Sequence, residues 1–220
     1  MDIFFWLTTK ALKGFFHLFY HYQVYLHTPL YPKGAIIAPN HSSFLDPPLI
    51  GASWPEETHY LARSSLFNYW FLRILLKNLH AHPIQGSVQD HSSFKIIRQL
   101  VSQGKKVVIF PEGNRSEDAK LQPIKTGVAM LALHMHCPII PTYIHGTYEA
   151  WPRHNRWPQL RLWARPKISI TCVFGAPIFA ESYLHLDKKE ARQAMSNQLE
   201  QSIEKLRVWY EQGAQGELPH

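Results

Sequence analysis

A histidine and an aspartate stand five residues apart directly after a short apolar run. Residues 40–46 read Asn-His-Ser-Ser-Phe-Leu-Asp, and they follow residues 34–38, whose apolar composition predicts a buried strand. Across a tight turn between a strand and a helix, the Asp46 carboxylate can hold one imidazole nitrogen of His41 as an N–H. The other nitrogen would then be free to accept a proton. This pattern predicts His41 as a general base that Asp46 orients, although an ordinary polar turn can contain the same pair.

A second polar segment, residues 110–116 with the sequence Phe-Pro-Glu-Gly-Asn-Arg-Ser, follows the clearest buried strand of the sequence. Gly113 lets the backbone approach a ligand closely, and the planar guanidinium of Arg115 suits a phosphate. Glu112 can accept a hydrogen bond from a hydroxyl, and Lys125 lies just beyond with a second positive charge. The segment therefore predicts a binding site for an anionic, hydroxyl-bearing ligand. A polar loop without a binding role would explain the proline and glycine, but not Arg115 and Glu112 together at a strand end.

The elements that position these residues alternate between strands and helices. Apolar runs predict strands at residues 34–38, 59–62, 79–84, 105–110, 139–144 and 168–174. Helical patterns cover residues 65–77, 90–103, 126–135 and 186–209. Another helix can begin after Asp46, because Pro47 suits a first helical turn. This alternation predicts an α/β fold with a mostly parallel, mixed sheet that helices flank.

The first 27 residues are rich in aromatic side chains. Four basic or histidine side chains recur three or four residues apart and would share one helical face: Lys10, Lys13, His17 and His21. The apolar side chains around them are Phe4, Trp6, Leu7, Leu12, Phe15, Phe16, Phe19, Tyr20 and Tyr22. Such a helix favours a membrane interface, and the alternative is a helix packed on the domain core. We expect it to be interrupted at Thr28-Pro29, so that residues 1–29 form an amphipathic interface helix and residues 30–220 the main domain.

A basic, tryptophan-rich segment covers residues 151–167 and has no acidic residue. Its aromatic and basic members are Trp151, Arg153, Arg156, Trp157, Arg161, Trp163, Arg165 and Lys167. Tryptophan beside arginine can stack on single-stranded nucleic acid or lie at an anionic membrane surface. A solvated loop with a few packed tryptophans is the third interpretation. We favour the membrane, because the N-terminal helix indicates the same partner.

The composition restricts the class of protein. The chain has 220 residues, and 23 basic against 16 acidic side chains give a net charge of +7, which suits a phosphate-bearing partner. Two cysteines are too few for a disulfide scaffold or a cysteine-rich zinc site, and we predict no metal site. No apolar run approaches the ~20 residues that a transmembrane helix needs.

The order and spacing of five short blocks resemble the glycerolipid acyltransferases typified by bacterial 1-acylglycerol-3-phosphate acyltransferase. Residues 40–46 match the family's N-H-x4-D motif, and residues 110–116 match F-P-E-G-T-R-S with Asn114 in place of threonine. Three later blocks resemble K-x-G, V-P-I-x-P and G-x-P-I, at residues 125–127, 137–141 and 175–178. The resemblance runs through residues 30–178, and the ordered set is far more specific than any single block.

The resemblance implies an O-acyltransferase with residues 30–220 as its catalytic domain. A fatty acyl group would pass from acyl-CoA or acyl-carrier protein to the hydroxyl of a lysophospholipid, foremost 1-acylglycerol-3-phosphate, to give phosphatidic acid. His41 and Asp46 would be the catalytic residues. The substrate-binding residues would be Arg63, Glu112, Gly113, Asn114, Arg115, Ser116 and Lys125. The implied reaction uses no cofactor or metal, and its lipid acceptor implies monotopic attachment to the cytoplasmic face of a membrane.

One position departs from the family. Its second motif usually ends in an arginine that is thought to help hold the phosphate or the donor, and Gln85 stands there in this sequence. The acceptor therefore stays open between 1-acylglycerol-3-phosphate, another lysolipid and glycerol-3-phosphate. A catalytically inactive lipid-binding module is the alternative outside the enzymes, but it need not retain both catalytic side chains with Glu112 and Arg115. We expect no nucleic-acid partner, because no recognised motif accompanies residues 151–167.

Overall fold

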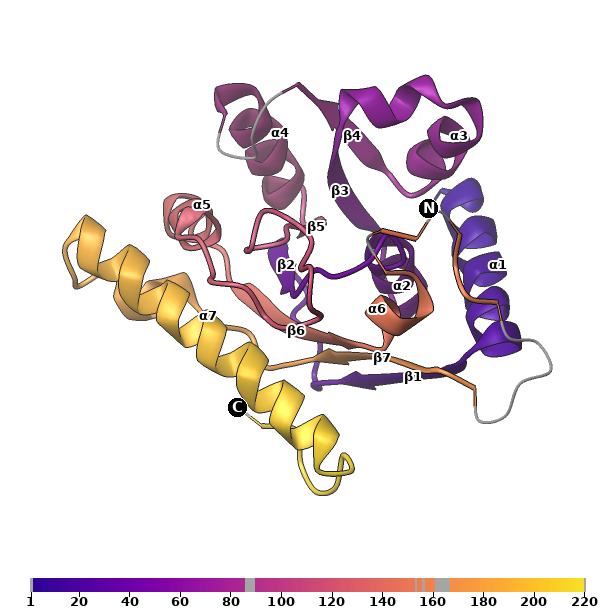
Figure 1. The fold of residues 1–220 in the computed structure, drawn as a ribbon. Coiled ribbons are helices and arrows are strands. Elements are labelled where there is room, and N and C mark those ends of the chain that lie inside the picture. Colours follow the sequence, from indigo (N-terminus) through magenta and orange to yellow (C-terminus); the bar gives the residue numbers. More distant parts are fainter. Residues whose placement is uncertain (1, 86–89, 153, 156, 161–166, 220) are drawn as a thin grey trace.

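One sheet of seven strands runs through the molecule, and helices cover both of its faces (Figure 1). The computed structural model describes residues 2–85, 90–152, 154–155, 157–160 and 167–219. The strands are β1 (His21–Leu26), β2 (Ala35–Pro39), β3 (Thr58–Arg63), β4 (Ala81–Ile84), β5 (Lys106–Val108), β6 (Ile139–His145) and β7 (Ser169–Phe174). Their order in the sheet is β1-β7-β6-β2-β5-β3-β4. All neighbours are parallel except β6 and β7, which confirms the predicted mostly parallel, mixed sheet.

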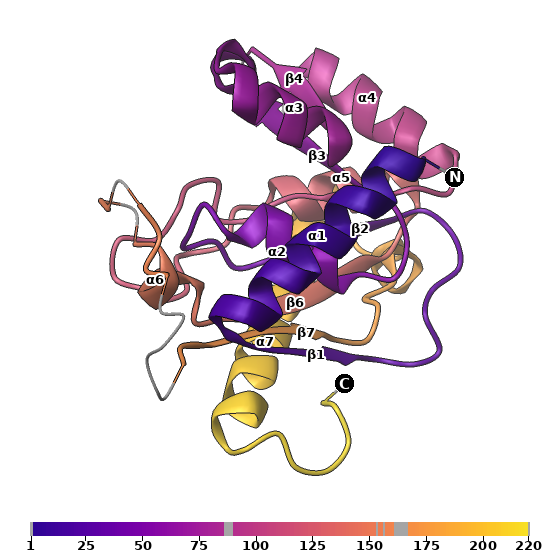
Figure 2. The same cartoon turned by 90° about the vertical axis from the view of Figure 1, so that its right-hand side faces the viewer.

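The helices form a layer on each side of this sheet. They are α1 (Ile3–Phe19), α2 (Asp46–Ser53), α3 (Trp70–Asn78), α4 (His91–Ser102), α5 (Gly127–Met135), α6 (Thr147–Ala150) and α7 (Lys188–Glu211), with 3-10 helices η1 (Ser64–Asn68) and η2 (Ala180–Tyr183). Helices α4, α5 and α7 contribute to one apolar core, and α1 and α2 contribute to the other. Figure 2 shows α1 lying across the face that it shares with α2.

Strand β2 lies in the middle of the sheet and explains why there are two cores. All five of its residues are buried. Successive side chains of a strand point to opposite faces, so Ile36 packs in the core of α4, α5 and α7 while Ile37 packs in the other. A parallel strand covered by helices on both faces needs such an unbroken apolar run.

The N-terminal helix is shorter than the sequence pattern predicts. Helix α1 ends at Phe19, because Tyr20 is extended (φ −133°, ψ 163°). The chain continues as β1, which pairs with β7 from His21↔Ser169 to Leu26↔Phe174. The aromatic and β-branched residues of this stretch suit a strand as well as a helix, and pairing with β7 decides between the two.

Helix α1 is apolar on two sides. Phe5 and Phe16 are fully buried, and the helix packs beside α2. Four other large apolar side chains of α1 are more than half exposed: Ile3, Phe4, Leu7 and Leu18. The helix therefore packs on the core and still presents an apolar surface to the outside. Among the residues that the structure describes, no helix is both long and apolar enough to cross a membrane.

Candidate active site

The two polar segments meet at one edge of the sheet. Residues 40–46 follow β2, and residues 110–116 follow the neighbouring parallel strand β5. Parallel neighbours bring their carboxyl ends to the same edge, where α/β proteins commonly place their sites. The segments are also joined directly, because the Ser116 N–H donates to the His41 carbonyl at 2.8 Å.

His41 and Asp46 form a hydrogen-bonded pair. The His41 Nδ1 lies 2.7 Å from the Asp46 Oδ2. Asp46 is fully buried at the first turn of α2, and its Oδ2 also accepts the backbone N–H groups of Ser42 (2.7 Å) and Ser43 (2.8 Å). A carboxylate held in this way keeps the proton of the neutral imidazole on Nδ1 and leaves Nε2 as its basic nitrogen. The His41 side chain is 17% exposed, so the ring keeps access to a substrate.

The segment after β5 holds the imidazole from its other sides. The Phe110 ring stacks on His41, with centroids 3.8 Å apart and planes at 21°. The Glu112 Oε1 accepts the backbone N–H of His41 at 2.7 Å. A ring fixed by stacking and by hydrogen bonds loses little freedom when the substrate binds, which favours catalysis.

Glu112 has protein partners on both of its carboxylate oxygens. Its Oε2 accepts the backbone N–H of Gln122 at 3.1 Å, while Oε1 accepts from His41. The sequence pattern predicts that Glu112 accepts from a substrate hydroxyl. In the structure its carboxylate joins the loop of His41 to the loop of Gln122. Burial raises the pKa of Glu112 to about 7, and the two backbone N–H groups oppose that rise.

This raised pKa predicts a specific pH dependence of stability. Between about pH 4.5 and 7 the folded state holds a proton on Glu112 that the unfolded state releases, so the free energy of unfolding falls as pH rises. Glu112→Gln removes that contribution. The wild type should lose about 3 kcal/mol relative to Glu112→Gln across this window, measured by urea unfolding at each pH.

Glu117→Gln is the matched control, because Glu117 is an exposed carboxylate of the same loop. A stability difference between wild type and Glu112→Gln that stays constant from pH 4.5 to 7 would contradict the raised pKa of Glu112.

Two positive side chains lie against the polar segments that meet at this edge. The guanidinium carbon of Arg115 lies 3.5 Å from the centroid of the Phe44 ring, which belongs to the first segment. Such a cation–π contact orients the flat group. Gly113 adopts φ +78°, and a Cβ added there would lie 2.8 Å from the Lys125 Nζ. The glycine thus permits both the turn and the close approach of the ammonium.

The comparisons with known proteins identify the family. The sequence model of the Acyltransferase family matches residues 13–145, which is more than half of the chain. A 1-acyl-sn-glycerol-3-phosphate acyltransferase of Bacillus subtilis is 31% identical over 176 residues, which cover 79% of this chain and 81% of that protein. The chain belongs to the acyltransferase family.

Further relatives of this acyltransferase carry similar names. A 1-acyl-sn-glycerol-3-phosphate acyltransferase of Cocos nucifera is 30% identical over 152 residues, and the matched part spans 68% of this chain but 47% of that protein. The crystal structure of a 1-acyl-sn-glycerophosphate (LPA) acyltransferase, PlsC, from Thermotoga maritima matches with a TM-score of 0.70 at 20% identity. That match covers 91% of this chain and 80% of the other, and it shows a shared fold.

The remaining predicted substrate-binding residues lie in different surroundings. Asn114 is exposed, whereas Ser116 is buried and its hydroxyl donates to Asp118 Oδ1 at 3.0 Å. Arg63 is exposed at the carboxyl end of β3, which is two strands away from β2 along the same edge. Gln85 is exposed and directly follows β4, at the end of the sheet.

The basic, tryptophan-rich segment is described only in part. Arg153, Arg156 and residues 161–166 lie outside the described residues. Trp151 packs against Phe44, with ring centroids 5.3 Å apart. The Lys167 ammonium donates to the carbonyls of His17 and Leu18 at the end of α1.

Sequence reasoning gave no role to Asn40, which anchors the first segment. Its side chain donates to the Ile144 carbonyl at 3.0 Å and accepts the Ile144 N–H at 2.7 Å. Ser42 adds a hydroxyl contact to Thr147 at 3.2 Å. The amide therefore ties the turn that carries His41 to the end of β6. Its position beside the predicted base was a usable signal, although its partner lies 104 residues away.

Proposed function

We propose that this acyltransferase moves a fatty acyl group from an acyl thioester to the hydroxyl of 1-acylglycerol-3-phosphate, which gives phosphatidic acid. The observation that carries the proposal is the His41–Asp46 pair at the edge where the cations of Arg115 and Lys125 lie against the polar segments. A base and positive charge at one edge suit an acceptor with both a hydroxyl and a phosphate. The printed names of the Bacillus subtilis and Cocos nucifera relatives support the same acceptor.

In the proposed mechanism His41 Nε2 takes the proton of the acceptor hydroxyl as its oxygen attacks the thioester carbonyl. The Asp46 carboxylate, already bonded to Nδ1, stabilises the imidazolium that forms. A carbon–oxygen bond forms and the carbon–sulfur bond breaks as the tetrahedral intermediate collapses. The imidazolium then returns its proton to the leaving thiolate. Acyl-CoA or acyl-carrier protein enters as the donor substrate, and this mechanism uses no cofactor.

A transfer assay with several acceptors tests the proposal. The full chain is mixed with radiolabelled acyl-CoA or acyl-carrier protein and with 1-acylglycerol-3-phosphate, lysophosphatidylcholine or glycerol-3-phosphate. We expect phosphatidic acid to form at least tenfold faster than the other products. Faster acylation of either other acceptor would move the activity to that substrate, and no transfer from either donor would favour a lipid-binding module.

We also propose monotopic attachment to the cytoplasmic face of a membrane, where acyl thioesters are made. Helices α1 and α3 both expose large apolar side chains. The two helices are neighbours, because Asn78 of α3 donates to Thr8 of α1 at 3.1 Å. We call these side chains the apolar surface: Ile3, Phe4, Leu7 and Leu18 of α1, with Tyr69, Trp70, Phe71 and Ile74 at α3. Trp70 is 79% exposed. Exposed apolar side chains that include a tryptophan and a tyrosine are typical of proteins that lie in a lipid interface.

Liposome flotation tests this attachment. Removing residues 1–27 would also remove strand β1 and the buried Phe5 and Phe16, so point variants are the better probe. The double variant Trp70→Ser/Phe71→Ser should bind at least about a hundredfold more weakly in high salt, where electrostatic attraction is screened. Leu184→Ser, at an exposed apolar residue outside this surface, is the control. Equal flotation of the double variant and the control in high salt would contradict the proposal.

A further inference from the structure

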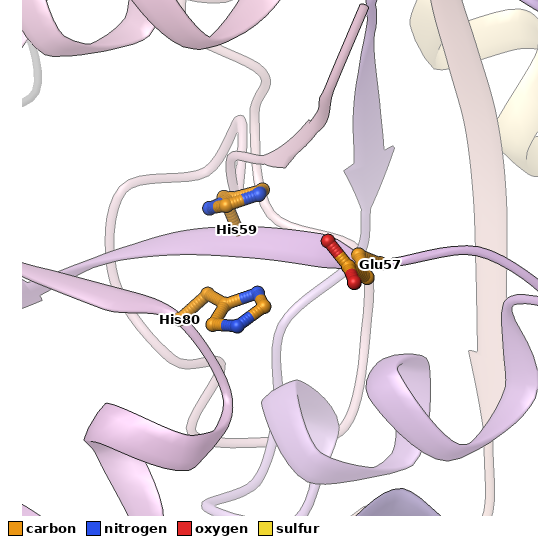
Figure 3. A group of neighbouring side chains, drawn as sticks. All are labelled: Glu57, His59 and His80. Atoms are coloured by element: carbon orange, nitrogen blue, oxygen red, sulfur yellow. The ribbon is translucent and has the colours of Figure 1, made fainter. Parts of the chain in front are cut away.

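Three potential metal ligands converge far from the active site. Glu57 and His59 lie at the start of β3, and His80 lies just before β4, so all three are at the amino edge of these strands (Figure 3). Each residue offers one ligand atom, and the three atoms all lie within 4.8 Å of one another. The catalytic pair is at the opposite, carboxyl edge of the sheet.

His80 is arranged like a metal-bound histidine. Its Nε2 lies 2.9 Å from the Asp2 Oδ2, which fixes that nitrogen as the N–H. The other ring nitrogen, Nδ1, is buried and has no hydrogen-bond partner in the described part of the chain. A carboxylate on the outer nitrogen of a histidine is the usual support for a metal ligand. His80 also has a left-handed backbone, with φ +54°, which is uncommon outside glycine.

His59 also has one ring nitrogen with a partner and one without, although its partner is a histidine and not a carboxylate. It is 8% exposed, and its Nδ1 lies 3.3 Å from the Nε2 of His82. Its Nε2 is buried and lacks a partner among the described residues. A buried nitrogen without a partner costs free energy, which a bound ion would recover.

Glu57 completes the group with a negative charge. Its Oε1 accepts the backbone N–H of Asp2 at 3.0 Å, and its Oε2 accepts the Lys105 ammonium at 2.9 Å. Each carboxylate oxygen keeps a second lone pair for a cation. The Lys105 side chain is 38% exposed, so its charge can move into water when a cation binds.

We propose that Glu57, His59 and His80 bind one divalent late transition-metal ion, with Zn²⁺ as the ion to test. Two imidazoles and one carboxylate form a set that Zn²⁺ adopts, with the fourth position left to water. Tetrahedral Zn²⁺ bonds of about 2.0–2.1 Å place ligand atoms about 3.3 Å apart. In the present structure the three ligand atoms lie within 4.8 Å of one another and the His59 and His80 rings are stacked, so these side chains must move closer together when the ion binds.

The ion would join three segments that are distant in sequence. It would bridge the start of β3 to the turn before β4 and, through Asp2, to the N-terminus of α1. Asp2 is the N-cap of that helix, since its Oδ1 accepts the Phe4 N–H at 2.9 Å. The proposed role is therefore structural and does not depend on the proposed acyl transfer.

Metal titration of the full chain, stripped with chelator, tests the site. We expect one Zn²⁺ per chain, and one Co²⁺ with a visible tetrahedral absorption band. Free Zn²⁺ at a hundred times its Kd should raise the Tm by about 5–10 °C. Glu57→Gln and His80→Gln should each weaken binding more than tenfold. Asp2→Asn should weaken it by about 10–100-fold, because it supports His80.

His185→Gln is the matched control, since His185 is an exposed histidine in the turn between η2 and α7. It should leave Zn²⁺ affinity unchanged. His59→Gln removes the most buried ligand, and Glu57→Gln and His80→Gln keep the test valid if that variant does not fold. Zn²⁺ affinity that is the same in Glu57→Gln, His80→Gln and wild type would overturn the proposal, and so would the absence of any saturable binding.

Discussion

Replacing His41 with alanine is expected to reduce acyl transfer by at least 10²–10⁴-fold, because the acceptor hydroxyl would lose its base. The fold should remain, since the imidazole is partly exposed and Asp46 keeps its two backbone donors. Turnover in the radiolabelled assay and far-UV circular dichroism measure the two effects. His91→Ala, at an exposed histidine of α4, is the control. Near wild-type turnover of His41→Ala would refute general-base catalysis by this residue.

Replacing Asp46, the partner of His41, with asparagine is also expected to lower turnover. One atom, the Asp46 Oδ2, accepts from Ser42, Ser43 and His41, so an asparagine oxygen in its place can keep all three contacts but carries no full negative charge. The imidazolium that forms when His41 takes the substrate proton would then lose its ionic stabilisation. Turnover should fall strongly but less completely than in His41→Ala.

Arg115→Ala is expected to raise the KM for the phosphorylated acceptor by about 10–100-fold, with a smaller effect on kcat. The lost charge-assisted contact to phosphate is worth about 1.5–3 kcal/mol. Arg115→Lys is the matched variant, because it keeps the charge but loses the flat group that lies over Phe44. It should fall between alanine and wild type. An unchanged acceptor KM with a raised donor KM would place Arg115 at the donor site.

The fold was predictable where local pattern and tertiary environment agree. The run at residues 35–39 is apolar throughout because helices cover both faces of β2, and this is the pattern that marks a central parallel strand. Residues 21–26 have no such unbroken apolar run. They are an edge strand whose partner, β7, is remote in sequence, so the local pattern predicts that the adjoining helix continues through them.

The contacts of the site were likewise predictable where the residues are close in sequence, and unpredictable where only the tertiary fold brings them together. His41 and Asp46 are five residues apart, and their spacing together with the family motif predicts the contact that the structure contains. The backbone partners of Glu112, on His41 and Gln122, could not be predicted, because they cannot be read from neighbouring side chains. The proposed metal ligands went unpredicted for a similar reason. Glu57 and His59 are brought to His80 only by the pairing of β3 with β4.

The pairing of β1 with β7 also sets an order of events during synthesis. The paired residues are about 150 positions apart, so at ~5–20 residues per second the first strand waits roughly 7–30 s for its neighbour to leave the ribosome. Throughout that interval the aromatic N-terminal segment has emerged without the strand that completes its packing. The β7-facing edge of β1 therefore stays unpaired for several seconds during synthesis, until the last strand of the sheet is made.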